Sequence, residues 1–383
     1  MVTTISPELL RLRLREDGLT LIDTRPEESF EAWHIPGAVN FPYSTDDDSV
    51  DVPALEEHTG VSPGDDIATI CAKGISSYDF ARALEEHGHE EVSVAQDGME
   101  GWSQLYELVS IPTVATSLEI FQIQRVAKGC LGYVIGSPTA REAIVVDPTR
   151  HTDEFTRVAA DDDMEITHVI DTHIHADHIS GGPAIAEETG ATYHLPSGAL
   201  DREIDLEFVP LERNDVLTLG EIDLKAIHTP GHTAEAISLL VGAEAVLTAD
   251  TLFTDGVGRT ELQFGEANAE AGARSLFHSI HGSLLTLPDG VSILPGHFAS
   301  EDPGVLGDVD DPIMTTVQDA RTELPLLQLE EEDFVDRVTA SIPEKPPNYD
   351  RMMAINTGRE PPEDESEATE LELGPNRCAA AAD

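Results

Sequence analysis

Four side chains that commonly bind metal ions lie within six residues of this chain. They are His173, His175, Asp177 and His178, in the string HIHADH that follows the strand-like segment HVID. Imidazole and carboxylate ligands together suit zinc, iron or manganese better than calcium or magnesium. A strand ending near Asp171 places both histidines of HIH on one side of an extended turn, with Asp177 and His178 at the start of the next helix. The string therefore predicts a metal centre.

Three further candidate ligands follow downstream, each directly after an apolar or β-rich segment. They are His232 in TPGHT, Asp250 in LTADT and His297 in LPGHF. A side chain that follows a strand in this way lies at the carboxyl end of that strand. We expect these three residues to join the HIHADH cluster.

This ordered set of ligands resembles the metallo-β-lactamase superfamily. The resemblance covers residues 118–359 and implies an αβ/βα sandwich with a one- or two-metal site between its sheets. In the persulfide dioxygenases of that superfamily one Fe(II) is held by the residues that match His173, His232 and Asp250. In its glyoxalase II-type thioester hydrolases the metal is Zn²⁺, one or two per chain, and Asp250 matches the bridging ligand. The other four residues then form a second metal site or support the first: His175, Asp177, His178 and His297.

Two segments favour the dioxygenase within this resemblance. ADTLFTDGVGRTELQ resembles the loop that follows the aspartate ligand in dioxygenases, and KGCLGYVIG resembles their early β-hairpin. Arg259 in the first segment could bind a carboxylate of the thiol substrate in a bidentate contact, and an internal ion pair is the alternative. Cys130 in the second lies between apolar segments, which favours a packing role.

The first hundred residues carry an independent signal at Cys71. The apolar strand IATI ends on this cysteine, and the loop CAKGISS then leads into the helix SYDFARALEEHG. Backbone N–H groups and the helix dipole both lower the pKa of a thiol at a helix N-terminus. The pattern predicts that Cys71 is a reactive thiolate.

Together with the segments IPGA and DGMEGW, this loop resembles a single rhodanese domain. The resemblance implies that Cys71 carries a sulfane sulfur as a persulfide and that Lys73, Gly74, Ser76 and Ser77 contact the substrate. Related phosphatase loops carry arginine six residues after the cysteine, where this chain has Ser77, so phosphatase chemistry is not expected. A catalytically silent sulfur-binding or docking module is the alternative.

The sequence thus predicts an α/β protein of two domains: a rhodanese-like domain over 1–112 and a metallo-β-lactamase-fold domain over 118–359. The segment IPTVATS forms the linker. Residues 360–383 are acidic with few large apolar residues, which predicts a disordered tail. The function favoured is iron-dependent oxidation of a small persulfide to sulfite and thiol, coupled to rhodanese sulfur transfer. The alternative is a zinc thioester hydrolase.

The net charge of the chain limits the classes of partner that we expect. The 383 residues include 74 acidic and 22 basic side chains, for a formal net charge of −52. Such a surface repels nucleic acid and anionic membranes, and suits a high-salt cytoplasm where screening limits self-repulsion. We expect small-molecule partners, namely a persulfide or thiol and a sulfane-sulfur donor. The sequence does not decide whether the chain forms a homo-oligomer. Three cysteines do not form a disulfide framework, and no segment is apolar enough for a signal peptide or a membrane span.

Overall fold

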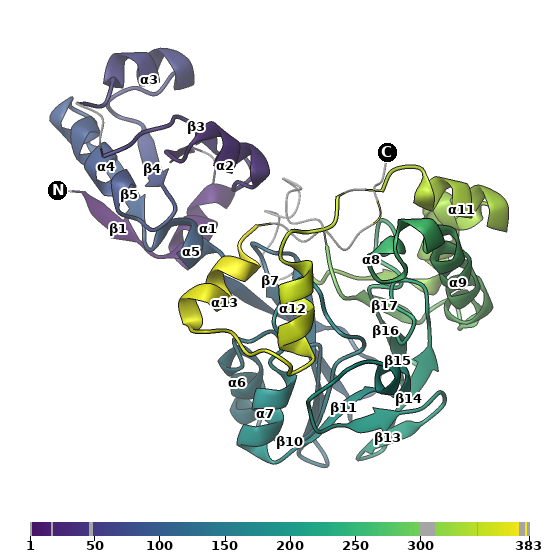
Figure 1. The fold of residues 1–383 in the computed structure, drawn as a ribbon. Helices are drawn as coiled ribbons and strands as arrows, with labels where there is room; N and C mark the ends of the chain where they lie inside the picture. The colour runs from purple at the N-terminus through teal and green to yellow at the C-terminus, as the bar shows by residue number, and fades with distance from the viewer. Residues whose placement is uncertain are drawn as a thin grey trace.

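The computed structural model describes residues 2–16, 18–45, 49–298, 311–342, 344–374 and 380. Its first domain is a five-stranded parallel sheet in the order β1-β5-β4-β2-β3, flanked by short helices (Figure 1). The strands are β1 Thr3–Ile5, β2 Leu19–Asp23, β3 Val39–Asn40, β4 Asp66–Ile70 and β5 Glu91–Ala95. The helices are α1 Pro7–Arg15, α2 Glu27–Ala32, α3 Val52–Thr59, α4 Ser76–Glu86 and α5 Gly98–Trp102.

The central strand β4 explains how this sheet presents Cys71. Four of its five residues are buried, as in a parallel strand covered on both faces. The side chains of Phe80 and Leu84 on α4 belong to the hydrophobic cluster that covers one of these faces. Cys71 follows β4 directly and lies one short loop before α4, as the sequence predicts.

The second domain contains two further sheets. One has seven strands: β6 Tyr106–Ile111, β7 Glu119–Arg125, β8 Cys130–Ser137, β9 Glu142–Val146, β10 Glu165–Ile170, β11 Thr192–Pro196 and β12 Val209–Leu211. The other has six: β13 Val216–Leu219, β14 Ile222–His228, β15 Ile237–Val241, β16 Ala245–Ala249, β17 Ser292–Pro295 and β18 Thr315–Thr316. Each sheet runs in sequence order, so neighbouring strands follow one another along the chain.

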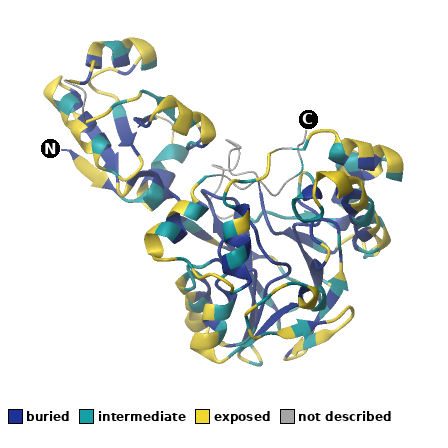
Figure 2. Ribbon diagram, in the orientation of Figure 1, coloured by how far each residue is buried: buried dark blue, intermediate teal, exposed yellow. Residues whose placement is uncertain are grey.

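The two sheets pack face to face with helices on both outer sides. One hydrophobic cluster joins Ile144 of the first sheet to Leu239 of the second and forms the core between them. The helices are α6 Asp153–Asp161, α7 Gly182–Thr189, α8 Glu261–Phe264, α9 Ala269–Gly282, α10 Val317–Glu323, α11 Glu331–Thr339, α12 Tyr349–Asn356 and α13 Glu365–Glu372. Helices α6, α7 and α12 cover the seven-stranded sheet, while α9 and α11 cover the other. This αβ/βα sandwich confirms the predicted fold class, and Figure 2 shows its buried centre.

The boundary between the domains differs from the predicted one. Residues 106–111, which the sequence assigns to the first domain, form β6 and pair with β7 at the edge of the seven-stranded sheet. Their alternating burial is typical of such an edge strand. The turn after β7 also inserts Val126 and Ala127 into the cluster that contains Trp33 and Trp102 of the first domain. The two domains therefore share a hydrophobic contact.

The predicted disorder of residues 360–383 is wrong for the part that forms α13. Ala368 packs against Met352 and Ile355 of α12, and Glu372 is 1% exposed. Buried ion pairs and these few contacts replace the large apolar side chains that the segment lacks. Residues 375–379 and 381–383, including Cys378, lie outside the described residues. Within the described residues, no helix is long and apolar enough to cross a membrane.

Candidate functional site

The predicted metal ligands lie together at the carboxyl ends of strands. The HIHADH string forms the turn between β10 and α7, and His232 lies in the loop after β14. Asp250 directly follows β16, and His297 lies two residues beyond β17. Helix α7 begins only at Gly182, so Asp177 and His178 lie in the preceding turn and not at the helix start that the sequence predicts.

His173, His232 and Asp250 form one buried cluster with ligand atoms within 4.8 Å of one another. Asp250 Oδ2 lies 3.8 Å from His173 Nε2 and 3.4 Å from His232 Nε2. Metal bonds of about 2.0–2.2 Å bring neighbouring ligand atoms to about 3 Å or slightly more. His173 Nε2 and Asp250 Oδ2 are buried without a hydrogen-bond partner. A metal ion would satisfy both atoms, so the three residues fit a metal site.

The protonation of this cluster also suits metal binding. Burial and the neighbouring His175 hold the pKa of His173 well below its ordinary value, so its imidazole is neutral. Burial would raise the pKa of Asp250, but the charge and hydrogen bond of His297 outweigh it and keep the carboxyl ionised. His232 Nδ1 lies 2.9 Å from the backbone oxygen of Arg259, a contact that leaves Nε2 for a metal.

A second cluster lies beside the first and contains a cysteine. Cys130, Asp177, His178 and His297 bring their ligand atoms within 4.8 Å of one another. His297 joins the clusters, because its Nε2 lies 2.9 Å from Asp177 Oδ2 and its Nδ1 lies 2.5 Å from Asp250 Oδ1. Cys130 Sγ lies 3.4 Å from Asp177 Oδ2. The sequence favours a packing role for Cys130. The structure instead places its sulfur among these candidate ligands.

His175 belongs to a third group, with Asp147 and Asp171. Its Nε2 lies 3.1 Å from Asp147 Oδ1, and Asp147 also accepts hydrogen bonds from the backbone N–H and the hydroxyl of Thr172. These acidic groups raise the pKa of His175 against the opposing effects of burial and of His178. In this arrangement His175 supports the turn beside the first cluster.

The side chain of Asn356, the last residue of α12, forms hydrogen bonds with the backbone of this turn. Its Nδ2 donates to the backbone oxygens of His175 and His178, at 2.8 and 2.7 Å. Its Oδ1 accepts from the backbone N–H of Ser180 at 2.9 Å. One amide side chain thus satisfies three backbone groups of the segment that carries the ligands.

Glu372, the last residue of α13, holds the same segment at a second point. Its Oε1 accepts from the backbone N–H of Ile179 at 2.8 Å. Its Oε2 pairs with Arg125 at 2.9 Å and with Arg150 at 2.8 Å. Burial alone would raise the pKa of Glu372, but the two arginines outweigh it and lower the pKa to about 2.

The side chain of Arg259 is not accessible to a substrate. Its guanidinium is 1% exposed and contacts Glu261 Oε1 at 2.5 Å. The internal ion pair, which the sequence leaves as an alternative, is therefore the observed arrangement. Arg259 contributes to the site through its backbone oxygen, which lies beside His232.

The Cys71 loop stabilises a thiolate. Ser77 Oγ donates to Cys71 Sγ at 3.3 Å. Burial would raise the pKa of Cys71, but hydrogen bonds from the side chains of Ser76 and Ser77 and from the backbones of Ser77 and Lys73 outweigh it and lower the pKa. Cys71 is 4% exposed and precedes the N-terminus of α4, so the helix dipole acts in the same direction.

The other loop residues have different roles. Lys73 points outward and pairs with Glu100 Oε1 at 2.8 Å. Gly74 has a φ of +73°, and a Cβ there would lie 3.1 Å from the amide nitrogen of Asp97. Glycine is required at this turn because other residues rarely adopt that conformation. Ser76 and Ser77 act on the sulfur, whereas Lys73 and Gly74 shape the loop.

Four residues of the site were not predicted from the sequence, namely Asp147, Asp171, Asn356 and Glu372. Asp147 and Asp171 carry a local signal, because each directly follows an apolar strand. Asn356 and Glu372 carry none, since they lie more than 170 residues beyond the turn that they hold.

Two family models match the chain. Residues 6–105 match the rhodanese-like domain and residues 127–297 match the metallo-beta-lactamase superfamily. The chain belongs to the metallo-beta-lactamase superfamily and carries an N-terminal rhodanese-like domain. Both predicted families are confirmed.

The named relatives include a persulfide dioxygenase and several hydrolases. The chain is 28% identical to the human protein named persulfide dioxygenase ETHE1, mitochondrial, over 53% of this chain and 73% of that one. It is also 28% identical to a hydroxyacylglutathione hydrolase of Polaromonas sp., over 60% of this chain and 92% of the hydrolase. The solved structure of ETHE1 from Myxococcus xanthus superimposes with a TM-score of 0.53 at 28% identity, and the match covers 62% of this chain and 98% of that structure. These relatives support an enzyme with a metal-binding site.

Proposed function

We propose that this protein is a persulfide dioxygenase with an attached sulfurtransferase domain. The reaction is R–S–SH + O₂ + H₂O → R–SH + SO₃²⁻ + 2 H⁺, which balances in atoms and charge. The observation that carries the proposal is the cluster of His173, His232 and Asp250, two imidazoles and one carboxylate. Such a set suits Fe(II), which would supply the redox chemistry and leave positions for the persulfide and O₂.

The neighbouring groups support this choice of ligands. His175 contacts Asp147, and His178 Nδ1 lies 3.1 Å from Asp177 Oδ2. Asp177 and His178 of HIHADH are thus paired with each other, and His175 is paired with Asp147 outside the string. The likeness to human ETHE1 and to the Myxococcus structure points in the same direction.

In the first domain, Cys71 carries the sulfane sulfur. The thiolate attacks the outer sulfur of a donor, forms the new S–S bond, and the remainder of the donor leaves with the electron pair. The hydrogen bonds from Ser76 and Ser77 that lower the pKa of Cys71 support this role, because only the thiolate is nucleophilic.

A zinc thioester hydrolase is the second candidate. The cluster of Cys130, Asp177, His178 and His297 favours it, because a second metal could bind there beside the first. The likeness to the Polaromonas hydrolase adds support. A metal pair of this kind would supply an activated water for hydrolysis.

Metal analysis of anaerobically purified protein, with O₂ uptake from glutathione persulfide, distinguishes the two. We expect about one iron per chain and sulfite as product. Asp250→Asn should lose both iron and O₂ uptake. The matched control is His228→Ala, an exposed histidine on β14 outside the three clusters, and it should retain both. Two zinc ions per chain, with hydrolysis of S-lactoylglutathione and no O₂ uptake, would establish the hydrolase instead.

A further inference from the structure

The loop of Cys71 packs against helix α5, which carries Glu100. The backbone N–H of Met99 donates to the backbone oxygen of Cys71 at 2.8 Å. The backbone N–H of Glu100 donates to the backbone oxygen of Ala72 at 3.1 Å. A Cβ at Gly98 would lie 2.2 Å from the backbone oxygen of Cys71, so glycine is required for this close approach. The backbone of Glu100 is therefore fixed beside the loop.

The side chain of Glu100 binds the basic residue of this loop. Lys73 is the only basic residue among residues 71–77, and its Nζ lies 2.8 Å from Glu100 Oε1. The hydrogen bond and the charge of Glu100 both raise the pKa of Lys73. The backbone of Lys73 contacts the sulfur of Cys71, and its flexible four-carbon stem is long enough to turn toward a ligand there. The pair with Glu100 keeps the ammonium group away from such a ligand.

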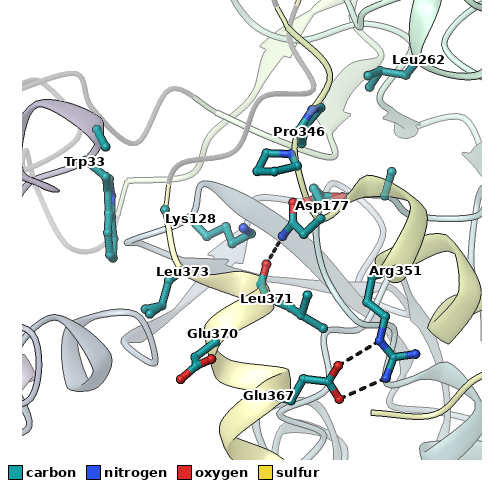
Figure 3. A pocket seen from close by; sticks show the side chains of 15 residues that line it. Trp33, Lys128, Asp177, Leu262, Pro346, Arg351, Glu367, Glu370, Leu371 and Leu373 are labelled. Atoms are coloured by element: carbon teal, nitrogen blue, oxygen red, sulfur yellow. Dashed lines mark hydrogen bonds and ion pairs between the residues drawn. The ribbon is translucent and has the colours of Figure 1, made fainter. Parts of the chain in front are cut away.

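A second carboxylate acts on Lys73 from the other domain. Glu370 of α13 lines a cavity of about 560 Å³ between the two domains, together with Trp33 and Lys128, and Figure 3 labels all three. The charge of Glu370 adds to the effect of Glu100 on the pKa of Lys73. Lys73 is therefore under the influence of carboxylates from both domains.

The other basic side chains of the first domain are also paired with carboxylates. Residues 1–105 contain 22 acidic and six basic side chains. Besides Lys73, the pairs are Arg11 and Arg15 with Glu107, Arg13 with Asp66, Arg25 with Asp23, and Arg82 with Glu86. The field of this domain is therefore negative and opposes the approach of anions.

The main groups that stabilise the sulfur are neutral. They are the hydroxyls of Ser76 and Ser77 and the backbones of Ser77 and Lys73. Thiosulfate would bring two negative charges to a thiolate, and like charges repel strongly in a partly buried site unless cations compensate them. Ile75 and Tyr78 are exposed beside these groups, on the loop and the first turn of α4. Their apolar surface suits the organic part of a donor.

We propose that Glu100 determines the sulfur donor of Cys71: it holds Lys73 away from the sulfur, so an organic persulfide is preferred to thiosulfate. The step is Cys71–S⁻ + R–S–SH → Cys71–S–SH + R–S⁻. A new S–S bond forms at Cys71, the S–S bond of the donor breaks, and R–S⁻ leaves with the electron pair. The inference rests on the proposed sulfurtransferase role of Cys71. Glu100 acts through Lys73 and is a positioning residue.

Alkylation of Cys71 tests this charge selection without any sulfur transfer. Iodoacetamide is neutral and iodoacetate is an anion, so the ratio of their rates, followed by peptide mass spectrometry, reports the field at the sulfur. In Glu100→Gln we expect the iodoacetate-to-iodoacetamide ratio to rise about threefold or more at low salt. The gain should disappear in about 1 M KCl, where the Debye length is about 3 Å. The control Glu86→Gln removes the same charge at the far end of α4, where Glu86 pairs with Arg82, and should leave the ratio unchanged.

Double variants show whether Lys73 causes the gain. Glu100→Gln/Lys73→Gln should lose it, because the released cation is gone. Glu100→Gln/Glu370→Gln should show at least the gain of the single variant, and it keeps the test decisive if Lys73 turns to Glu370. A gain that persists without Lys73, or that appears equally in Glu86→Gln, would overturn the proposal. So would the absence of a gain in both Glu100→Gln and Glu100→Gln/Glu370→Gln.

Sulfur loading of Cys71 tests the donor itself. Intact-protein mass spectrometry follows loading from thiosulfate and from the persulfide of 2-mercaptoethanol, whose organic part is uncharged. We expect the wild type to load at least about tenfold faster from the persulfide, and Glu100→Gln to load about threefold faster from thiosulfate than the wild type does. Equal loading of the wild type from both donors would overturn the donor preference and keep the sulfurtransferase role. No loading from either donor, with the expected alkylation ratios, would remove that role and keep Glu100 as the residue that excludes anions from Cys71.

Discussion

The carboxylate of Glu372 accepts a hydrogen bond from the backbone N–H of Ile179, the residue that follows the last histidine of HIHADH. The C-terminal helix α13 is thereby attached to the metal-binding turn across more than 190 residues of sequence. Because Glu372 also pairs with Arg125 at the end of β7, it connects the turn to the strand that leads into the interdomain contact. The C-terminal segment is therefore part of the support of the metal centre.

Glu372→Gln should destabilise the protein by roughly 3–5 kcal/mol at neutral pH, because it leaves two buried arginines without their carboxylate. The pKa of Glu372 is lowered from its ordinary 4.5 to about 2, so its contribution is complete above about pH 4.5 and is lost as the pH falls toward 2. Chemical denaturation at a series of pH values should show the difference between wild type and variant narrowing below pH 4.5. Glu370→Gln on the same helix is the control and should keep wild-type stability. A difference that grows on acidification would contradict this account.

Asn356→Asp should weaken metal binding about 10- to 100-fold, as changes to groups that orient metal ligands commonly do. The aspartate would replace two donated hydrogen bonds with a carboxylate that faces the backbone oxygens of His175 and His178. Competition with a chelator measures the affinity. Asn348→Asp is the control, since that side chain contacts the backbone of α13 and not the turn. Equal loss of metal in both variants would mean that Asn356 has no specific effect on the turn.

Cys71 should react with iodoacetamide along a pH profile whose midpoint lies below the ordinary thiol value of 9.0. The rate should fall as the pH drops through that midpoint, because the reactive thiolate becomes protonated. Ser77→Ala removes one hydrogen bond to the sulfur and should move the midpoint upward. Peptide mass spectrometry assigns the label to Cys71. A midpoint that stays in place in Ser77→Ala would exclude this hydrogen bond as a cause.

Cys71→Ser should remove the mass gain of one sulfur that a sulfane donor produces, and the thiosulfate-linked activity with it. Direct oxidation of supplied glutathione persulfide should change little, since the three-ligand cluster lies in the other domain. Intact-protein mass spectrometry and O₂ uptake measure the two effects. Loss of direct oxidation in this variant would show instead that sulfur must pass through Cys71.

The melting temperature should rise with salt. At a formal charge of −52 the acidic side chains repel one another, and the Debye length shortens from about 10 Å at 0.1 M to about 3 Å at 1 M. Thermal melts in KCl between about 0.1 and 2 M test this expectation. A flat response across the series would mean that the acidic surface is not an adaptation to salt.

The local pattern of residues was sufficient to place the candidate metal ligands and Cys71 at the ends of their strands. The ligands of HIHADH, His232, Asp250 and His297 each follow a strand within a few residues, and strand order then brings the strand ends together. Cys71 likewise lies between β4 and α4, where local hydrogen bonds and the helix dipole already act on the sulfur. Such placements are predictable because a residue's position relative to its own strand or helix is a short-range property.

Only the tertiary structure decided which of these groups act together and what supports them. His175 and His173 belong to different clusters, and Cys130 belongs to the second cluster. Both facts depend on distances between strands, which the spacing of residues in the sequence does not encode. Helix α13 has a composition typical of disorder, and it is ordered by buried ion pairs of Glu372 with Arg125 and Arg150 from other parts of the chain. The cavity beside Trp33 and Lys128 exists only where two domains meet. Long-range contacts of this kind depend on the packed fold as a whole, so a single sequence does not reveal them.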